Sequence, residues 1–264
     1  MIHINFGQWI KELLYNFRDN VTILLVFIFL FPVLIFLYLM WRITNTILPY
    51  GVGASLADCF VFVTDKFFFA LLIVPMSVYL LQYLNKNDFN ILFILRQKSR
   101  KILWTKHMFR TFIFSSLVTT YFTICTFIIG GFFSTSYINW NSISSIYYLA
   151  NNKVTDNVSI LNVLVMFLIF CILLLTILNM LFQLLQWITN GYLFGWLVIL
   201  SIGIWDMFQR TYAVMYGKLT ISHSIWERSG YMNISIMYGI FVGLVIFIIG
   251  IVAVKRKDFL NEVG

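Results

Sequence analysis

The chain has 264 residues, of which 61% are hydrophobic and only 11% are charged, and its mean hydropathy is +0.90. Soluble domains carry about 25% charged residues, so this composition excludes a soluble globular protein and predicts an integral membrane protein. The net charge of +8 does not indicate nucleic-acid binding, because the basic residues lie at the borders of apolar runs and no soluble domain is left to carry them.

Residues 1–20 are expected to form an amphipathic helix that lies flat in the membrane interface. Aromatic and aliphatic residues recur at i, i+3, i+4, i+7, i+8 and i+11, and polar residues occupy the opposite face. The segment mixes acids with bases and lacks a small-residue cleavage site, so we expect no signal peptide here. Packing of this helix against the spans of the same chain is the alternative.

Six apolar runs predict six transmembrane helices. The first has no charged residue and extends for about 31 Å at 1.5 Å per residue, which is enough for a hydrocarbon core of about 30 Å. In the last, three glycines at positions 239, 243 and 250 are expected to allow close helix packing. The predicted spans cover residues 21–41, 67–84, 111–133, 159–187, 191–205 and 234–254.

The segment 85–110, between the second and third spans, carries seven basic residues and one acid. Translocation of Lys and Arg is disfavoured, so such a segment belongs on the cytoplasmic face. With both termini on that face, the cytoplasmic segments hold 12 of the 18 Lys and Arg residues. The sequence therefore predicts an all-α integral membrane protein, a single transmembrane domain over 1–264 with six spans and both termini in the cytoplasm.

Two interpretations of the segment 85–110 remain open. Its apolar residues recur at roughly helical spacing, which predicts a short helix, a basic break and a second helix at the membrane surface. The segment could simply follow the positive-inside rule, or it could be a docking surface for a cytoplasmic partner.

Four amide side chains follow one face at the end of the fourth span. Unpaired polar groups in hydrocarbon are costly, so we do not expect these amides to face lipid. Hydrogen bonding between helices of one bundle is one explanation, and a face toward a cavity or a partner permease is the other. The four residues are Asn179, Gln183, Gln186 and Asn190.

The sequence offers no catalytic residues and no metal site. The cores of the six predicted spans hold no Asp, Glu, Lys, Arg or His, whereas an intramembrane enzyme or an ion-coupled carrier requires such groups. The chain contains neither HExxH nor GxxxxGK[ST], so we expect no bound cofactor and no nucleotide hydrolysis by this chain. Its three cysteines lack the paired spacing of a metal site or a disulfide framework.

The run Ser99-Arg100-Lys101-Ile102-Leu103-Trp104-Thr105-Lys106 is similar to the Ser-Arg, aliphatic, Lys run that follows the second span in permease subunits of type-2 ABC exporters. The whole chain also resembles this family in its order of elements: an interfacial N-terminal helix, six spans, a basic loop after the second span and a large external segment before the sixth. In that family the basic loop forms the coupling helix that contacts a separate ATPase.

The resemblance implies a permease that exports an amphipathic substrate such as a peptide antibiotic, a drug or a lipid-like compound. Small permeases of this kind often serve in immunity to peptide antibiotics. The implied partners in the bacterial plasma (inner) membrane are two copies of a cytoplasmic ATPase, which would hold ATP and Mg, and a second permease, identical or a sister subunit. A non-transporting assembly or sensor module and a channel or secondary carrier are the alternatives. The implied ATPase-coupling residues are Arg96, Lys98, Ser99, Arg100, Lys101, Trp104 and Lys106.

Overall fold

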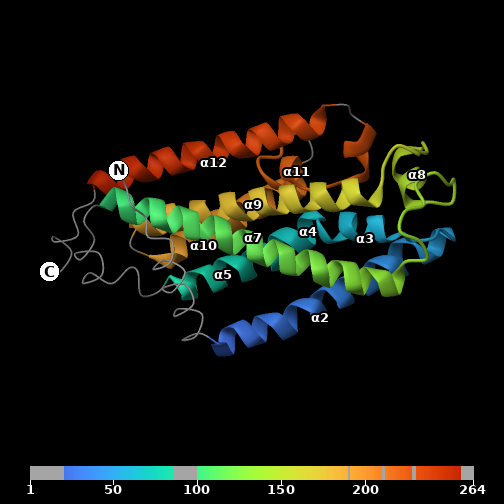
Figure 1. Cartoon of the computed structure of the whole chain (residues 1–264), viewed down its shortest axis with the longest axis horizontal. Coiled ribbons are helices and arrows are strands. Elements are labelled where there is room, and N and C mark those ends of the chain that lie inside the picture. The colour runs from blue at the N-terminus through green and yellow to red at the C-terminus, as the bar shows by residue number, and fades with distance from the viewer. Residues whose placement is uncertain (1–20, 86–99, 190, 210–211, 228–229, 257–264) are drawn as a thin grey trace.

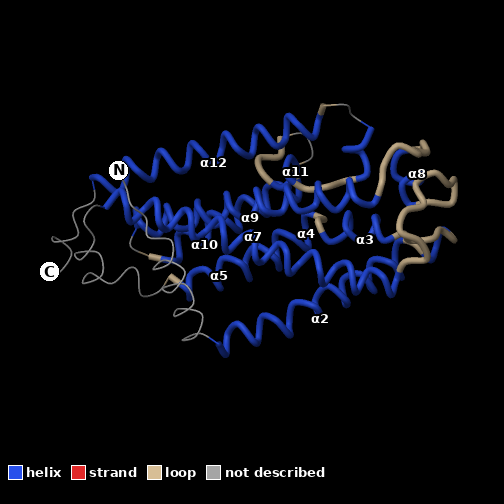
Figure 2. Tube along the Cα trace, in the orientation of Figure 1, coloured by secondary structure: helices blue, strands red, loops and turns tan. Residues whose placement is uncertain are grey.

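The computed structural model describes residues 21–85, 100–189, 191–209, 212–227 and 230–256. It is about 82% helical, and no strand occurs in these ranges. The helices run lengthwise beside one another in one elongated bundle, and most of the described loops lie at one end, around α8 (Figures 1 and 2). The expectation of an all-α protein is confirmed.

Each predicted span overlaps a helix. Five helical stretches are long and apolar enough to cross a membrane, and α10 is apolar but has only 17 residues. The stretch 66–84, which ends in α5, is the shortest of the five at 19 residues. The remaining long helices are α2 (Val21–Thr46), α7 (Arg100–Phe133), α9 (Ile160–Thr189) and α12 (Tyr231–Arg256), beside the shorter α10 (Tyr192–Phe208).

The bundle has two chemically different ends. At one end α2, α7 and α10 begin and α5, α9 and α12 finish (Figure 1, left). We call this the basic end, because Lys101, Lys106 and Lys255 lie there. The opposite end, the cap end, carries the short helices α3 (Leu56–Val63) and α8 (Ile146–Asn151) together with the loops around them (Figure 2).

The second pass through the bundle is interrupted rather than straight. It starts as α3, breaks at Thr64 and Asp65, resumes as α4 (Lys66–Phe68), widens into a π-helical turn over Phe69–Ile73 and finishes as α5 (Val74–Leu84). Pro75, in the first turn of α5, has no N–H, and its ring would clash with a carbonyl of a regular preceding helix. The wider π turn accommodates that ring.

The structure differs from the sequence-based expectation in the segment 85–110. Arg100–Arg110 is not a separate surface helix, because α7 runs without a break from Arg100 to Phe133. The first three turns of α7 therefore belong to the same continuous helix as the predicted third span. The rest of the segment, 86–99, and the predicted helix 1–20 lie outside the described residues.

Helix α9 occupies the middle of the bundle and contacts α7, α10, α12, α5 and α3. Buried aromatic rings fill the space between helices. The ring centroid of Phe122 in α7 lies 5.3 Å from that of Phe31 in α2 and 5.3 Å from that of Phe167 in α9. The outer faces of α2 and α12 are apolar and exposed, as for Phe29 (71%) and Phe241 (65%). Exposed apolar faces of this extent are typical of a surface that lipid or another membrane protein covers.

Candidate functional site

Trp104 joins the start of α7 to the end of α12. Its side chain is fully buried, and its indole N–H donates to the carbonyl of Phe247 at 3.1 Å. The ring lies directly against the α12 backbone at Gly250, where only a glycine leaves room for it. On its other side it meets Trp187 of α9 edge to face, with ring centroids 6.5 Å apart. Three helices are thus fixed together at the basic end.

Two further residues extend this connection. The buried His107, one turn along α7, packs against the same Trp187 ring, with the two ring centroids 5.8 Å apart. Arg110, also buried, donates from Nη1 to Oδ1 of Asn85, the residue that caps the end of α5, at 3.0 Å. The first three turns of α7 are therefore held by α5, α9 and α12, and a displacement of one would be transmitted to the others.

The predicted ATPase-coupling residues that the structure describes differ in how far they are exposed. Lys101 is exposed, Lys106 is half-buried, and Arg100 is the first residue of α7. Trp104 faces the interior of this chain and offers no aromatic surface to another protein. The others, Arg96, Lys98 and Ser99, lie outside the described residues.

A polar seam lies between α7 and α9. On α7, buried polar residues recur every four positions, so that they share one face: His107, Thr111, Ser115 and Thr119. Asn179 of α9 faces this row and donates from Nδ2 to Ser115 Oγ at 3.2 Å and to Ser77 Oγ of α5 at 2.9 Å. One amide therefore hydrogen-bonds two neighbouring helices within the apolar bundle.

Two of the other predicted amides, Gln183 and Gln186, also face the interior of this chain. Gln183, one turn beyond Asn179, is 1% exposed, yet neither its Oε1 nor its Nε2 has a hydrogen-bond partner among the described residues. Gln186 is buried as well, and Asn190 lies outside the described residues. Interhelical hydrogen bonding accounts for Nδ2 of Asn179, whereas Oδ1 of Asn179 and both polar atoms of Gln183 are buried without a hydrogen-bond partner among the described residues.

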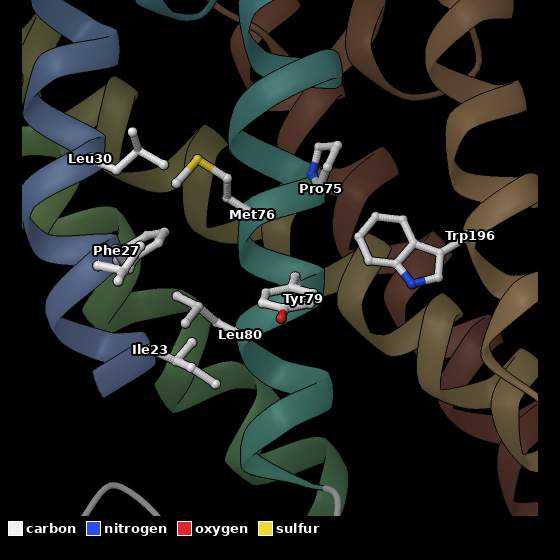
Figure 3. Close-up of a pocket in the computed structure, with 9 residues that line it drawn as sticks. Ile23, Phe27, Leu30, Pro75, Met76, Tyr79, Leu80 and Trp196 are labelled. Atoms are coloured by element: carbon white, nitrogen blue, oxygen red, sulfur yellow. The ribbon is translucent and has the colours of Figure 1, made fainter. Parts of the chain in front are cut away.

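An apolar groove of about 340 Å³ runs between α2, α5 and α10. Figure 3 shows Phe27 and Leu30 on the α2 side, Met76 and Tyr79 on the α5 side and Trp196 across from them. Tyr79 and Leu30 are about half exposed, so the groove opens on the outer surface of the bundle rather than into its core. Its lining suits an acyl chain or the apolar part of an amphipathic molecule.

Sequence reasoning missed a buried carboxylate at the cap end. Asp58, in the first turn of α3, is fully buried, and its Oδ2 accepts from Ser55 N at 2.9 Å and Ser55 Oγ at 2.6 Å. Its Oδ1 accepts from the indole N–H of Trp140 at 2.8 Å and lies 2.8 Å from Nε2 of His223. Each carboxylate oxygen of Asp58 therefore has two polar partners.

Aromatic rings surround this carboxylate and close the cap. Trp140 stacks on Tyr147 with centroids 4.9 Å apart and lies 5.8 Å from Trp226. His223 contacts Trp140 edge to face, at 5.6 Å. Asp58 therefore links α3 to the segment after α7 and to the segment before α12, which are far apart in the sequence.

A second buried carboxylate, Asp206 near the end of α10, organises the following loop. It accepts from the backbone N–H groups of Val214, Met215 and Tyr216 at 2.6–2.7 Å. Burial and this carboxylate raise the pKa of Tyr216 well above its usual value.

Within the described ranges, no three His, Cys, Asp or Glu side chains converge as they would around a metal ion. Both carboxylates have the geometry of structural anchors.

Comparison of this chain with protein-family models, with curated proteins and with solved structures found no match. The fold itself defines the class of protein to which this chain belongs. Five long apolar helices, packed lengthwise around α9 with exposed apolar outer faces, make it a multi-pass α-helical membrane protein.

Proposed function

We propose that this chain is the permease subunit of an ABC exporter, driven by ATP that a separate cytoplasmic subunit hydrolyses. The observation that carries the proposal is the start of α7. The basic sequence from Arg100 onward is continuous with a membrane-spanning helix, and Trp104 and Arg110 fix it to three other helices. A partner that moves this basic segment would thereby move the spans, which is what coupling to an ATPase requires.

We further propose six spans with both termini and the basic end in the cytoplasm. The excess of Lys and Arg at the basic end supports this orientation. The even number of lengthwise passes supports it too, since α2 begins and α12 finishes at the same end (Figure 1). The cap then lies outside the cell. The apolar groove between α2, α5 and α10 supports an amphipathic substrate that moves from the membrane outward.

The test is purification of the chain from its native membrane together with its partners. We expect a P-loop ATPase at one copy per permease, two of each in the complex, with ATP hydrolysis that the permease stimulates. The variant Arg96→Glu/Lys98→Glu/Arg100→Glu reverses three charges and leaves the Trp104 packing intact. A single interface hot spot is worth ~2 kcal/mol or more, so reversal of these three charges should weaken ATPase binding at least thirtyfold.

The matched control is Lys153→Glu/Lys218→Glu, which reverses charges toward the cap end. It should keep both the ATPase and its activity. Absence of any stoichiometric ATPase, or wild-type binding by the triple variant at normal membrane abundance, would refute the proposal and leave the basic segment as a topology signal.

A further inference from the structure

Helix α2 contains a proline, Pro32, in its interior. In a regular helix the N–H of residue 32 would donate to the carbonyl of Ile28, but proline has no N–H and its ring crowds that carbonyl. The carbonyl of Ile28 accepts instead from the hydroxyl of Tyr121 in α7, at 2.6 Å. A neighbouring helix therefore supplies the hydrogen bond that Pro32 removes, as backbone groups inside a membrane require.

Tyr121 also holds the part of α2 that precedes Pro32, residues 21–31, which we call the first half of α2. Within this half only Phe27 and Phe31 are buried. The ring centroid of Tyr121 lies 6.3 Å from that of Phe27 and 5.9 Å from that of Phe31. One residue of α7 thus contacts the backbone of this half through its hydroxyl and both buried side chains through its ring.

The apolar groove has its whole α2 wall on this half of the helix. The α2 residues that line the groove all precede Pro32 in the chain, and they are Ile23, Val26, Phe27 and Leu30. Leu30 of α2 and Pro75 of α5 lie at the same end of the groove (Figure 3). Sharp bends in long helices occur almost always at proline. A turn of the first half of α2 about Pro32 would therefore change the width of the groove.

We propose that Pro32 is a hinge in α2 and that the hydroxyl of Tyr121 fixes the angle of this hinge. Interhelical hydrogen bonds in membrane proteins are individually weak, so the bond to Ile28 opens without loss of the fold. When it opens, the first half of α2 turns about Pro32 and the groove between α2 and α5 widens toward the lipid. The hinge depends on the contacts between α2 and α7 and does not depend on the export function.

The experiment measures the distance across the groove by pulsed spin-label spectroscopy on the purified full-length chain. One label is attached at Val21→Cys in α2 and the other at Leu193→Cys in α10, since both positions are exposed. Tyr121→Phe keeps the ring and removes only the hydroxyl. The first half of α2 is about 16 Å long, so a change of about 20° at Pro32 moves its free end by about 5 Å.

We expect Tyr121→Phe to broaden the distance distribution of this pair and to shift it by about that amount. The control pair, Leu37→Cys in α2 and Phe208→Cys in α10, lies beyond the hinge, and its distance should stay as in the wild type. An unchanged distance between Val21→Cys and Leu193→Cys in the Tyr121→Phe variant would overturn the hinge. An equal shift of both pairs would overturn the assignment of the hinge to Pro32.

A double-mutant cycle tests the link between Pro32 and Tyr121. Pro32→Ala restores the N–H that donates to Ile28, so the Tyr121 hydroxyl becomes dispensable. Tyr121→Phe should lower the melting temperature by about 1–3 °C in the wild type, and by less than half as much in Pro32→Ala. Tyr238→Phe is the matched control, because its hydroxyl donates to the carbonyl of Val214, and it should act equally in both backgrounds. Equal effects of Tyr121→Phe in the two backgrounds would overturn the link.

Discussion

The indole of Trp104 lies against α12 at Gly250 so closely that a Cβ at position 250 would overlap the ring. The same ring donates a hydrogen bond to Phe247, one helical turn earlier. The first turns of α7 and the last turns of α12 are therefore packed backbone to ring, with no adjustable side chain between them.

Replacing Gly250 tests this contact directly. We expect Gly250→Ala to destabilise the protein by about 1–3 kcal/mol, because the added methyl group forces the buried indole out of position. Gly243→Ala, on the same helix, is the matched control: a Cβ there would have its nearest neighbour, in Ile177, at an ordinary 3.8 Å. Thermal unfolding in detergent measures both. Equal melting temperatures for the two variants would contradict the packing.

The two interior amides of α9 should respond to leucine with opposite signs. Asn179→Leu removes two interhelical hydrogen bonds, to Ser77 and Ser115, each worth about 0.6 kcal/mol in a membrane protein, and should destabilise the bundle. Gln183→Leu replaces an amide without a partner among the described residues, and should be neutral or stabilising. The measurement is thermal unfolding in one detergent. Destabilisation of similar size in both variants would mean that Gln183 has a partner.

Asp58 should control the order of the cap. Asp58→Ala leaves the buried donors of Ser55, Trp140 and His223 without their acceptor, at about 1–3 kcal/mol for each unsatisfied group. We expect hydrogen exchange to rise across residues 134–158 while α9 and α12 stay protected. Asp58→Asn keeps one acceptor oxygen and should have a smaller effect.

The control for the cap is Asp156→Ala, because Asp156 is an exposed acid in the same part of the chain. It should leave hydrogen exchange unchanged. If Asp58→Ala also left hydrogen exchange unchanged, the carboxylate would not hold the cap together.

Orientation in the membrane can be measured by cysteine labelling. All three native cysteines are buried, and burial raises the pKa of the Cys59 thiol to about 12, so little reactive thiolate is present at neutral pH and the background is low. We expect Ser144→Cys, exposed at the cap end, to react with impermeant maleimide on whole cells. Ser99→Cys should react only after permeabilisation. The reverse pattern would place the cap in the cytoplasm and remove the proposed coupling role.

The passes through the bundle could be predicted from the sequence because a membrane requires long apolar helices. Their ends could not. Composition marks 111–133 as a span, yet α7 begins at Arg100 because buried contacts of Trp104 and Arg110 continue the helix through a basic sequence. The break at Asp65 and the π turn before Pro75 also had no signal in hydropathy alone.

The polar interior was accessible to sequence reasoning only in part. Helical spacing identified the amides of α9, although not which helix each one meets. The Ser55-x-x-Asp58 pattern is a capping box and could have marked the start of α3. The contacts of Asp58 with Trp140 and His223 could not be inferred, because 82 and 165 residues separate these partners in the sequence.

Unequal helix lengths determine how the protein sits in the bilayer. In the six-span arrangement that we propose, α10 has 17 residues and extends about 26 Å, which is shorter than a hydrocarbon core of about 30 Å. By the same measure α7, with 34 residues, extends about 51 Å. The excess extends beyond the bilayer at the basic end, where Arg100–Arg110 precede the predicted third span. In that arrangement the basic start of α7 projects from the membrane as part of one continuous helix, where a protein in the surrounding water could contact it without entering the bilayer.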